Sequence, residues 1–284
     1  MTTIESRRCW IGSALAAQDE PAPARKVDAH VAAALRSYGE QTWPHGAVRA
    51  GLPLGRLELA GLKAGECDFA PPAPWVRRYA DAAGAPIVMI EAVVAVDIAS
   101  AHEQLGAWLA SRTDPTPAPT CKTQGVEAGE IGFVGLSRPQ RIAWIAFARG
   151  NVAVRVLCLD PRVDPHPDMP GIARTIDQAI LAVPPLGKAT APPRPAFERL
   201  LPDRTSCTVG DLVVLDLAVR DPAGGDPQLR FVVAGPGQGY VEADASGRQV
   251  LHTTGAGAIT LCVQACGALG TVAEATTRIE VAAR

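Results

Sequence analysis

The fold of the first half of this chain is decided by residues 140–160, QRIAWIAFARGNVAVRVLCLD. The pattern predicts two strands joined at Gly150-Asn151, because both residue types tolerate the positive φ that a short hairpin turn requires. Both arms are apolar at nearly every position, which is typical of strands covered on both faces, or on one face with a neighbouring helix. We expect one face of the hairpin to pack against helices over residues 101–112 and 170–182. The alternative is that the hairpin faces the other way, with Ile145 and Phe147 toward the helices. The residues on the expected face are Ile142, Trp144, Ala146, Val154, Val156 and Cys158.

The composition bounds the class of protein. A chain of 284 residues suggests two domains, and a hydrophobic content of 48% is enough to build cores. The net charge of −2 provides no basic field for nucleic acid or for an anionic membrane. The longest apolar run, residues 87–98, is interrupted by Glu91 and Asp97 and is shorter than the ~20 residues of a membrane helix.

The first residues have the order of a signal peptide. Arg7-Arg8 precede a short apolar run and the small-residue site Ala14-Leu15-Ala16. The run is short and Glu5 lies among the basic residues, so a cytoplasmic tail is the alternative. We expect residues 1–26 to be a disordered tail or a degenerate signal, with a periplasmic or secreted protein in the second case.

Residues 27–183 are expected to form an α+β domain, an antiparallel sheet with helices on one face. Residues 43–74 are hard to interpret, apart from a short strand at Leu57 and Leu59. Ser100 and Glu103 have the spacing of a capping box, and Asp168 can cap a second helix. The expected elements are a helix from Asp28 to Gly39, a strand over 87–98, a helix from Ser100 to Arg112, a strand over 130–137, the hairpin and a helix over 170–182.

Residues 184–204 are rich in proline and are expected to be an interdomain linker. Short alternating strands and glycine-rich turns follow without a helical period, which predicts a β-sandwich over residues 205–284. The alternating runs are residues 213–219, 229–233, 259–263 and 279–281.

Two resemblances add to this interpretation. The turn Gly235-Pro236-Gly237, the turn at residues 244–247 and the strand at Ile259 resemble a bacterial immunoglobulin-like or cadherin-like repeat over about residues 205–281. This resemblance implies a spacer or an adhesion surface; cadherin-like relatives bind calcium through clustered acids, of which Asp221 and Asp226 remain here. The first half, with its Arg-Gly-Asn-Val hairpin and a helix containing Ile-Asp, resembles an α+β module of uncharacterised bacterial exported proteins, and carries over no catalytic residues.

The cysteines form no C-x-x-C pair. Cys262 and Cys266 would stand ~13 Å apart along one strand. If the protein is exported, Cys67 and Cys121 are the expected disulfide partners, because both are expected in loops beside proline-rich segments. Cys158 is expected to be a small buried hydrophobe. The seven are Cys9, Cys67, Cys121, Cys158, Cys207, Cys262 and Cys266.

The remaining polar candidates favour structural roles. The histidines, His30, His45, His102, His166 and His252, have no zinc-site spacing. Asp164, His166 and Asp168 suggest a metal loop, but the prolines between them favour a rigid lead-in to the helix. Residues 235–239 lack the ending of a phosphate loop. Arg149 and Arg155 are expected in a turn and at a solvent-facing strand position.

The sequence therefore assigns no catalytic, cofactor-binding or metal-binding residue. It favours a non-catalytic, extracytoplasmic bacterial protein that binds or scaffolds a protein or a cell-envelope component. One alternative is an enzyme or accessory subunit with a cleft between the sheet and residues 43–74. The other is a small-molecule binding module in the α+β domain.

Overall fold

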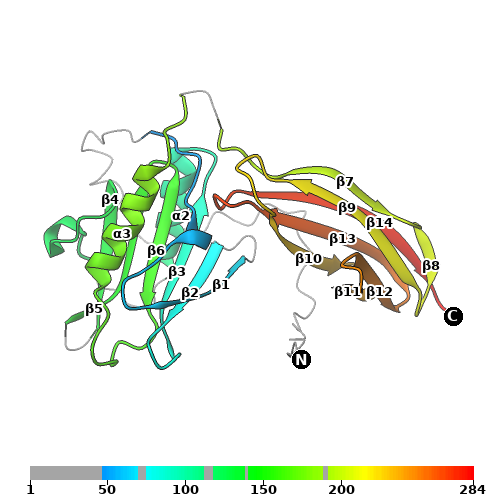
Figure 1. The fold of residues 1–284 in the computed structure, drawn as a ribbon, viewed down its shortest axis with the longest axis horizontal. Coiled ribbons are helices and arrows are strands. Elements are labelled where there is room, and N and C mark those ends of the chain that lie inside the picture. Colours follow the sequence, from blue (N-terminus) through cyan, green and yellow to red (C-terminus); the bar gives the residue numbers. More distant parts are fainter. Residues whose placement is uncertain (1–46, 70–74, 112–117, 138–139, 188–190) are drawn as a thin grey trace.

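The computed structural model describes residues 47–69, 75–111, 118–137, 140–187 and 191–284 (Figure 1). Strands make up 49% of the described residues, among which α2 and α3 are the only α-helices, so the described part of the protein is mostly β. Neither helix is long and apolar enough to cross a bilayer. The helix expected after Asp28 and the signal-like segment lie outside the described residues.

The first half contains a six-stranded antiparallel sheet in the order β1-β2-β3-β6-β5-β4. The predicted hairpin is β5–β6, joined at Gly150-Asn151. The strand predicted at Leu57 and Leu59 is wrong: both residues are buried in a loop that follows a 3-10 turn, Leu54–Arg56, and leads to β1. The strands are β1 (Lys63–Phe69), β2 (Trp75–Ala80), β3 (Pro86–Val94), β4 (Ile131–Ser137), β5 (Arg141–Arg149) and β6 (Val152–Cys158).

The helices are α2 (Ile98–Ala110) and α3 (Met169–Ala182). The cap predicted for α3 is confirmed, because Asp168 Oδ1 accepts a hydrogen bond from Gly171 N at 3.0 Å. The cap predicted for α2 is wrong. Asp97, not Ser100, begins α2, and its carboxylate accepts from Ser100 N at 2.8 Å. Asp97 lies one turn earlier and can satisfy the exposed backbone N–H of Ser100.

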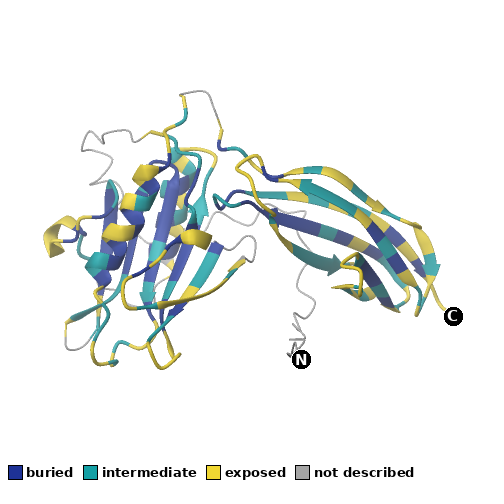
Figure 2. Cartoon of the chain, in the orientation of Figure 1, coloured by how far each residue is buried: buried dark blue, intermediate teal, exposed yellow. Residues whose placement is uncertain are grey.

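The helices lie on opposite faces of the sheet, so the prediction of helices on one face is wrong (Figure 1). Helix α3 packs on the face that carries Ile145, Phe147, Val154 and Val156, and α2 packs on the reverse face. Three alanines of the hairpin, Ala146, Ala148 and Ala153, lie under α2. Because both arms are apolar at nearly every position, both faces need cover. Figure 2 shows the two strands mostly buried near the turn, and the first residues of β5 are half-buried.

The register of the hairpin also corrects the expected core face. The two-residue turn pairs Phe147 with Val154 and Ile145 with Val156, so these four side chains share the α3 face. Trp144 points to the α2 side instead, where it is half-buried. Gly135, its partner on β4, leaves room for the indole: a Cβ there would lie 1.8 Å from Trp144 Nε1.

The second half contains two four-stranded sheets, β10-β13-β14-β8 and β11-β12-β9-β7. Their facing side chains form one apolar cluster that includes Leu251, Ile259, Leu261 and Ile279. The strands are β7 (Ala196–Pro202), β8 (Ser206–Thr208), β9 (Leu212–Arg220), β10 (Gln228–Ala234), β11 (Gln238–Ala243), β12 (Gln249–Gly255), β13 (Gly257–Cys266) and β14 (Val272–Ala282).

Strand β7 lies inside the segment expected to be a linker. It pairs with β9 at the edge of its sheet, with Pro202 at its end. A proline is compatible with an edge strand because its missing N–H faces away from the ladder. Proline content alone therefore placed the end of the linker too late.

The turn between β13 and β14, residues 267–271, contacts the first half of the chain. Leu52 N, in the first half, donates to Leu269 O at 3.0 Å, and Thr271 Oγ1 donates to Pro193 O, in the segment that leads into β7, at 2.6 Å. Gly51 is required at this contact, because a Cβ there would lie 2.1 Å from Leu269 O. Gly270 lies against the ring of Trp75 on β2. These contacts join the two halves at one end of the sandwich.

Candidate functional site

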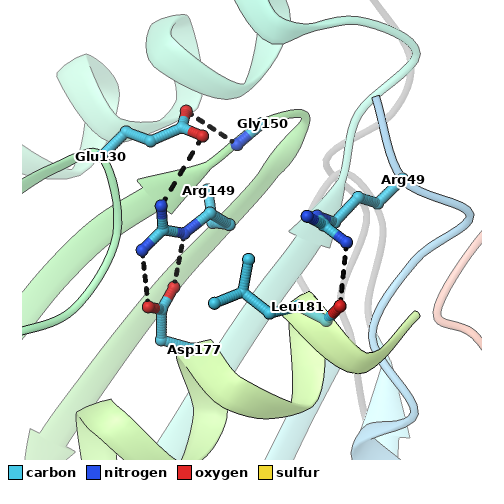
Figure 3. A network of polar contacts seen from close by, with 6 residues as sticks. All are labelled: Arg49, Glu130, Arg149, Gly150, Asp177 and Leu181. Atoms are coloured by element: carbon cyan, nitrogen blue, oxygen red, sulfur yellow. Dashed lines mark hydrogen bonds and ion pairs between the residues drawn. The ribbon is translucent and has the colours of Figure 1, made fainter. Parts of the chain in front are cut away.

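The most concentrated group of buried charges lies at the end of the central hairpin (Figure 3). Arg149, the last residue of β5, donates from Nε to Asp177 Oδ1 at 2.8 Å and from Nη2 to Asp177 Oδ2 at 2.6 Å. Glu130, just before β4, places Oε1 3.7 Å from Arg149 Nη1 and accepts from Gly150 N at 3.1 Å. The Arg149 side chain is 21% exposed. The expectation of a solvated turn arginine is therefore wrong.

Asn151, the second turn residue, extends this network to other segments. Its Oδ1 accepts from Arg49 N at 2.6 Å and its Nδ2 donates to Ala95 O at 2.8 Å. Arg49 in turn donates from Nη1 to Leu181 O at 3.0 Å and to Val183 O at 2.7 Å. A cation at this position satisfies carbonyl groups at the C-terminal end of α3.

The electrostatics of this group are those of a structural clamp. The hydrogen bond to Asp177 raises the pKa of Arg149 above its ordinary value, so the guanidinium stays charged. A buried carboxylate is tolerated when it is paired and hydrogen-bonded, as Asp177 and Glu130 are here. Each charge is paired with a neighbour, so the group holds the hairpin turn against α3. This group of Glu130, Arg149 and Asp177 is called the clamp below.

A second ion pair lies on the α2 face of the same sheet. Arg155 on β6 bonds its cross-strand neighbour Glu91 on β3, and its guanidinium lies 5.3 Å from the ring centroid of Trp108. The expectation of a solvent-facing Arg155 is wrong, since the side chain is 25% exposed beneath α2. This pair joins β3, β6 and α2, and it too is structural.

The residues considered for a metal site do not converge. Asp164 lies 3.8 Å from Arg141, His166 Nε2 lies 3.0 Å from Ile142 O, and Asp168 caps α3. Asp221, considered through the cadherin-like resemblance, accepts from Ala223 N at 3.0 Å and from Ala268 N at 2.6 Å. Within the described ranges, no three His, Cys, Asp or Glu side chains are grouped to hold an ion.

The expected Cys67–Cys121 disulfide is wrong. Cys67 lies on edge strand β1, whereas Cys121 lies beside β4 at the opposite edge, where its N donates to Gly132 O. Five strand spacings of ~4.8 Å separate these edges by about 24 Å. The thiol of Cys158 is buried, as predicted. Burial raises the pKa of the Cys121 thiol to about 12, so this thiol stays protonated at neutral pH and is a poor nucleophile.

The outer face of sheet β11-β12-β9-β7 is the side that points away from the sandwich core. It carries a row of two stacked rings and a leucine, called the exposed row below: Tyr240, His252 and Leu212. The ring of Tyr240 stacks on His252, with centroids 4.7 Å apart and planes 4° apart. Leu212 follows on β9, directly opposite His252. Tyr240 is 50% exposed and Leu212 is 51% exposed. His252 Nε2 also lies 3.0 Å from Glu242 Oε1.

Sequence reasoning missed both the clamp and the exposed row. The three residues of the clamp, Glu130, Arg149 and Asp177, are far apart in sequence. The only sequence signal for them was the pair of segments Arg-Gly-Asn-Val and Ile-Asp, which contain Arg149 and Asp177. Tyr240 and Leu212 lie on strands that become neighbours of β12 through pairing alone.

No protein-family model and no curated protein matches this chain. Among solved structures, the tandem Ig repeats of Dlar show a TM-score of 0.25 and 8% sequence identity, over 54% of this chain and 88% of that chain. A TM-score this low carries no argument about fold or function, and the proposals below rest on the chain's own geometry.

Proposed function

We propose that this protein is a non-catalytic binding or scaffolding protein, built from an α+β domain and an immunoglobulin-like β-sandwich. The exposed row of Tyr240, His252 and Leu212 on the outer face carries the proposal. The eight strands β7–β14 support the sandwich, since they form two sheets around one apolar cluster. The proposal keeps the domain boundaries expected from the sequence, and it starts the sandwich at about residue 196 because β7 pairs with β9.

The chemistry of the outer face suits a protein partner. Exposed tyrosines are enriched among residues that dominate binding energy, because they bury a large rigid surface and keep a hydroxyl for hydrogen bonding. Val214, which is half-buried, and Val250, which is buried, form the next cross-strand row on the same face, beside Glu242. Apolar residues bordered by charges are the usual composition of a binding patch.

The same proposal includes an extracytoplasmic location and a partner in the cell envelope. It rests on the signal-like order of basic, apolar and small residues in the first part of the chain. Fusing residues 1–26 to a reporter that is active only after export tests it. An inactive reporter would favour the cytoplasmic alternative.

Photocrosslinking tests the binding surface. We would replace Tyr240 with p-benzoyl-phenylalanine in the full-length protein, irradiate the cells that express it, and look for a discrete crosslinked band. Thr276, exposed on the outer face of the opposite sheet, is the matched control position. We expect a band from position 240 that Leu212→Asp abolishes. Equal crosslinking from both positions, or none from position 240, would remove the outer face as the binding surface.

The two alternative functions have no specific observation in their favour in the described part of the chain. The buried carboxylates Glu91, Glu130 and Asp177 are engaged by arginines. A thermal-shift screen against metals and metabolites would reveal a small-molecule site, because a ligand raises the melting temperature by mass action.

A further inference from the structure

Two cysteines, Cys67 and Cys266, lie at the place where the sandwich contacts the first half of the chain. Cys266 is the last residue of β13, and its cross-strand neighbour on β10 is Gln228. Gln228 Nε2 donates to Cys67 O on β1 at 3.2 Å. The backbone of Cys67 is therefore held against the strand pair that carries Cys266, although the two residues are far apart in sequence.

Both cysteine side chains belong to the apolar cluster of the six-stranded sheet. Cys266 is 2% exposed and is counted in that cluster, and Cys67 packs against it. Side chains along a strand point alternately to the two faces of the sheet. Val263 on β13 faces the sandwich core, so Cys266, three residues further along, points outward, toward β1.

Trp75 on β2 lies beside both positions. A Cβ added at Gly55 would lie 3.7 Å from Trp75 Cζ2 and 3.9 Å from Cys67 Sγ. The opposite edge of the ring meets Gly270, in the turn that follows Cys266. The indole Nε1 is buried and has no hydrogen-bond partner. The indole thus lies between the surroundings of Cys67 and the turn that follows Cys266.

The electrostatics agree with this proximity. Burial, together with the nearby charge of Cys67, raises the pKa of Cys266 to about 12. Burial also raises the pKa of Cys67, while Arg77 on the neighbouring strand lowers it. Charges influence each other in this way only over short distances, since water and salt screen longer ones.

We propose that Cys67 and Cys266 form a reversible disulfide that locks the sandwich onto edge strand β1. β1 is hydrogen-bonded on its β2 side, at the edge of the sheet, and its register shifts between Ala64 and Cys67. A disulfide requires its two Cα atoms to lie about 4.4–6.8 Å apart, and β1, hydrogen-bonded along one side only, is the strand that would adjust to reach this separation. Both thiols are reduced in the structure.

The oxidant is a small-molecule disulfide such as oxidised glutathione. Cys67, the more exposed thiol and the one beside Arg77, loses its proton and attacks one glutathione sulfur, releasing glutathione thiolate. The small thiolate fraction of Cys266, held close to Cys67, then attacks the Cys67 sulfur of the mixed disulfide and releases the second glutathione thiolate. Two protein thiols are oxidised and one glutathione disulfide is reduced to two thiols.

Oxidation of the full-length protein tests the lock. We would incubate it with oxidised glutathione, block remaining thiols with iodoacetamide, and map disulfide-linked peptides by mass spectrometry. We expect a peptide pair joining Cys67 to Cys266, absent from Cys67→Ser and Cys266→Ser. Cys262→Ser is the matched control, since Cys262 lies on the same strand and face, and it should keep the link. The link should raise the melting temperature by several degrees, reversed by dithiothreitol.

Three results would overturn the proposal. The first is glutathione carried separately on Cys67 and Cys266 without a link between them. The second is a link from Cys266 to a different cysteine. The third is no reaction at either thiol after prolonged oxidation at pH 8.5. If Cys67→Ser folds poorly, Cys266→Ser supplies the same comparison from the other half.

Discussion

At the residue scale, the ion pair of Arg149 and Asp177 is expected to contribute strongly to the stability of the fold. Removing one partner of a buried pair leaves an uncompensated charge, which typically costs ~3–5 kcal/mol. We expect Asp177→Asn to lower the free energy of unfolding by about this amount in urea titrations followed by circular dichroism. The matched control is Glu198→Gln, which removes the exposed partner of Arg220 and should cost under ~1 kcal/mol. Equal effects would show that the clamp adds no stability.

Buried acids should also make the protein sensitive to alkali. Burial raises the pKa of Tyr79, whose hydroxyl donates to Leu57 O, to about 12, and the thiols of Cys121 and Cys266 shift in the same direction. Since these folded-state pKa values lie above the unfolded ones, their stabilisation is full below about pH 9 and is lost as the pH rises toward 12. Each group should then remove about 1.4 kcal/mol per pH unit. Tyr79→Phe should show a smaller loss between pH 10 and 12 in urea titrations; an unchanged slope would contradict this.

At the scale of the element, the hairpin β5–β6 is the core of the first half, and its α3 face is the more deeply buried one. Phe147 is completely buried there, and truncating such a residue typically costs ~3–5 kcal/mol. Trp144 is half-buried on the α2 side. We therefore expect Phe147→Ala to lower the melting temperature more than Trp144→Ala does, by differential scanning calorimetry. The opposite ranking would make the α2 face the principal core.

At the scale of the whole molecule, the β13–β14 turn couples the two halves. Gly51 has a φ of 151° and faces Leu269 O, so Gly51→Ala should push this turn away. Gly84→Ala is the matched control, because Gly84 also has a positive φ but no atom within 4 Å of the added Cβ. In calorimetry, we expect Gly51→Ala to separate the melting transitions of the two halves. Gly84→Ala should lower stability without separating them, and identical thermograms would rule out coupling through this turn.

The sequence by itself determined the local elements. The hairpin with its Gly150-Asn151 turn, the helix capped by Asp168 and the alternating strands of the second half are present in the structure. Such features depend on turn chemistry, capping and the period of apolar residues, which act between near neighbours in the chain. The same reasoning went wrong where two local signals competed, as at Asp97 and Ser100.

Only the tertiary structure decided which faces are covered and which polar residues meet. The register of β5–β6 placed Phe147 and Trp144 on opposite faces, and the strand order placed Cys67 far from Cys121. The packing of the two halves placed the backbone of Cys67 against Gln228, the cross-strand neighbour of Cys266. The partners of Arg149 come from segments that pair only after folding. Their energies depend on burial and on contacts between distant segments, and neither quantity is encoded in residue spacing along the chain.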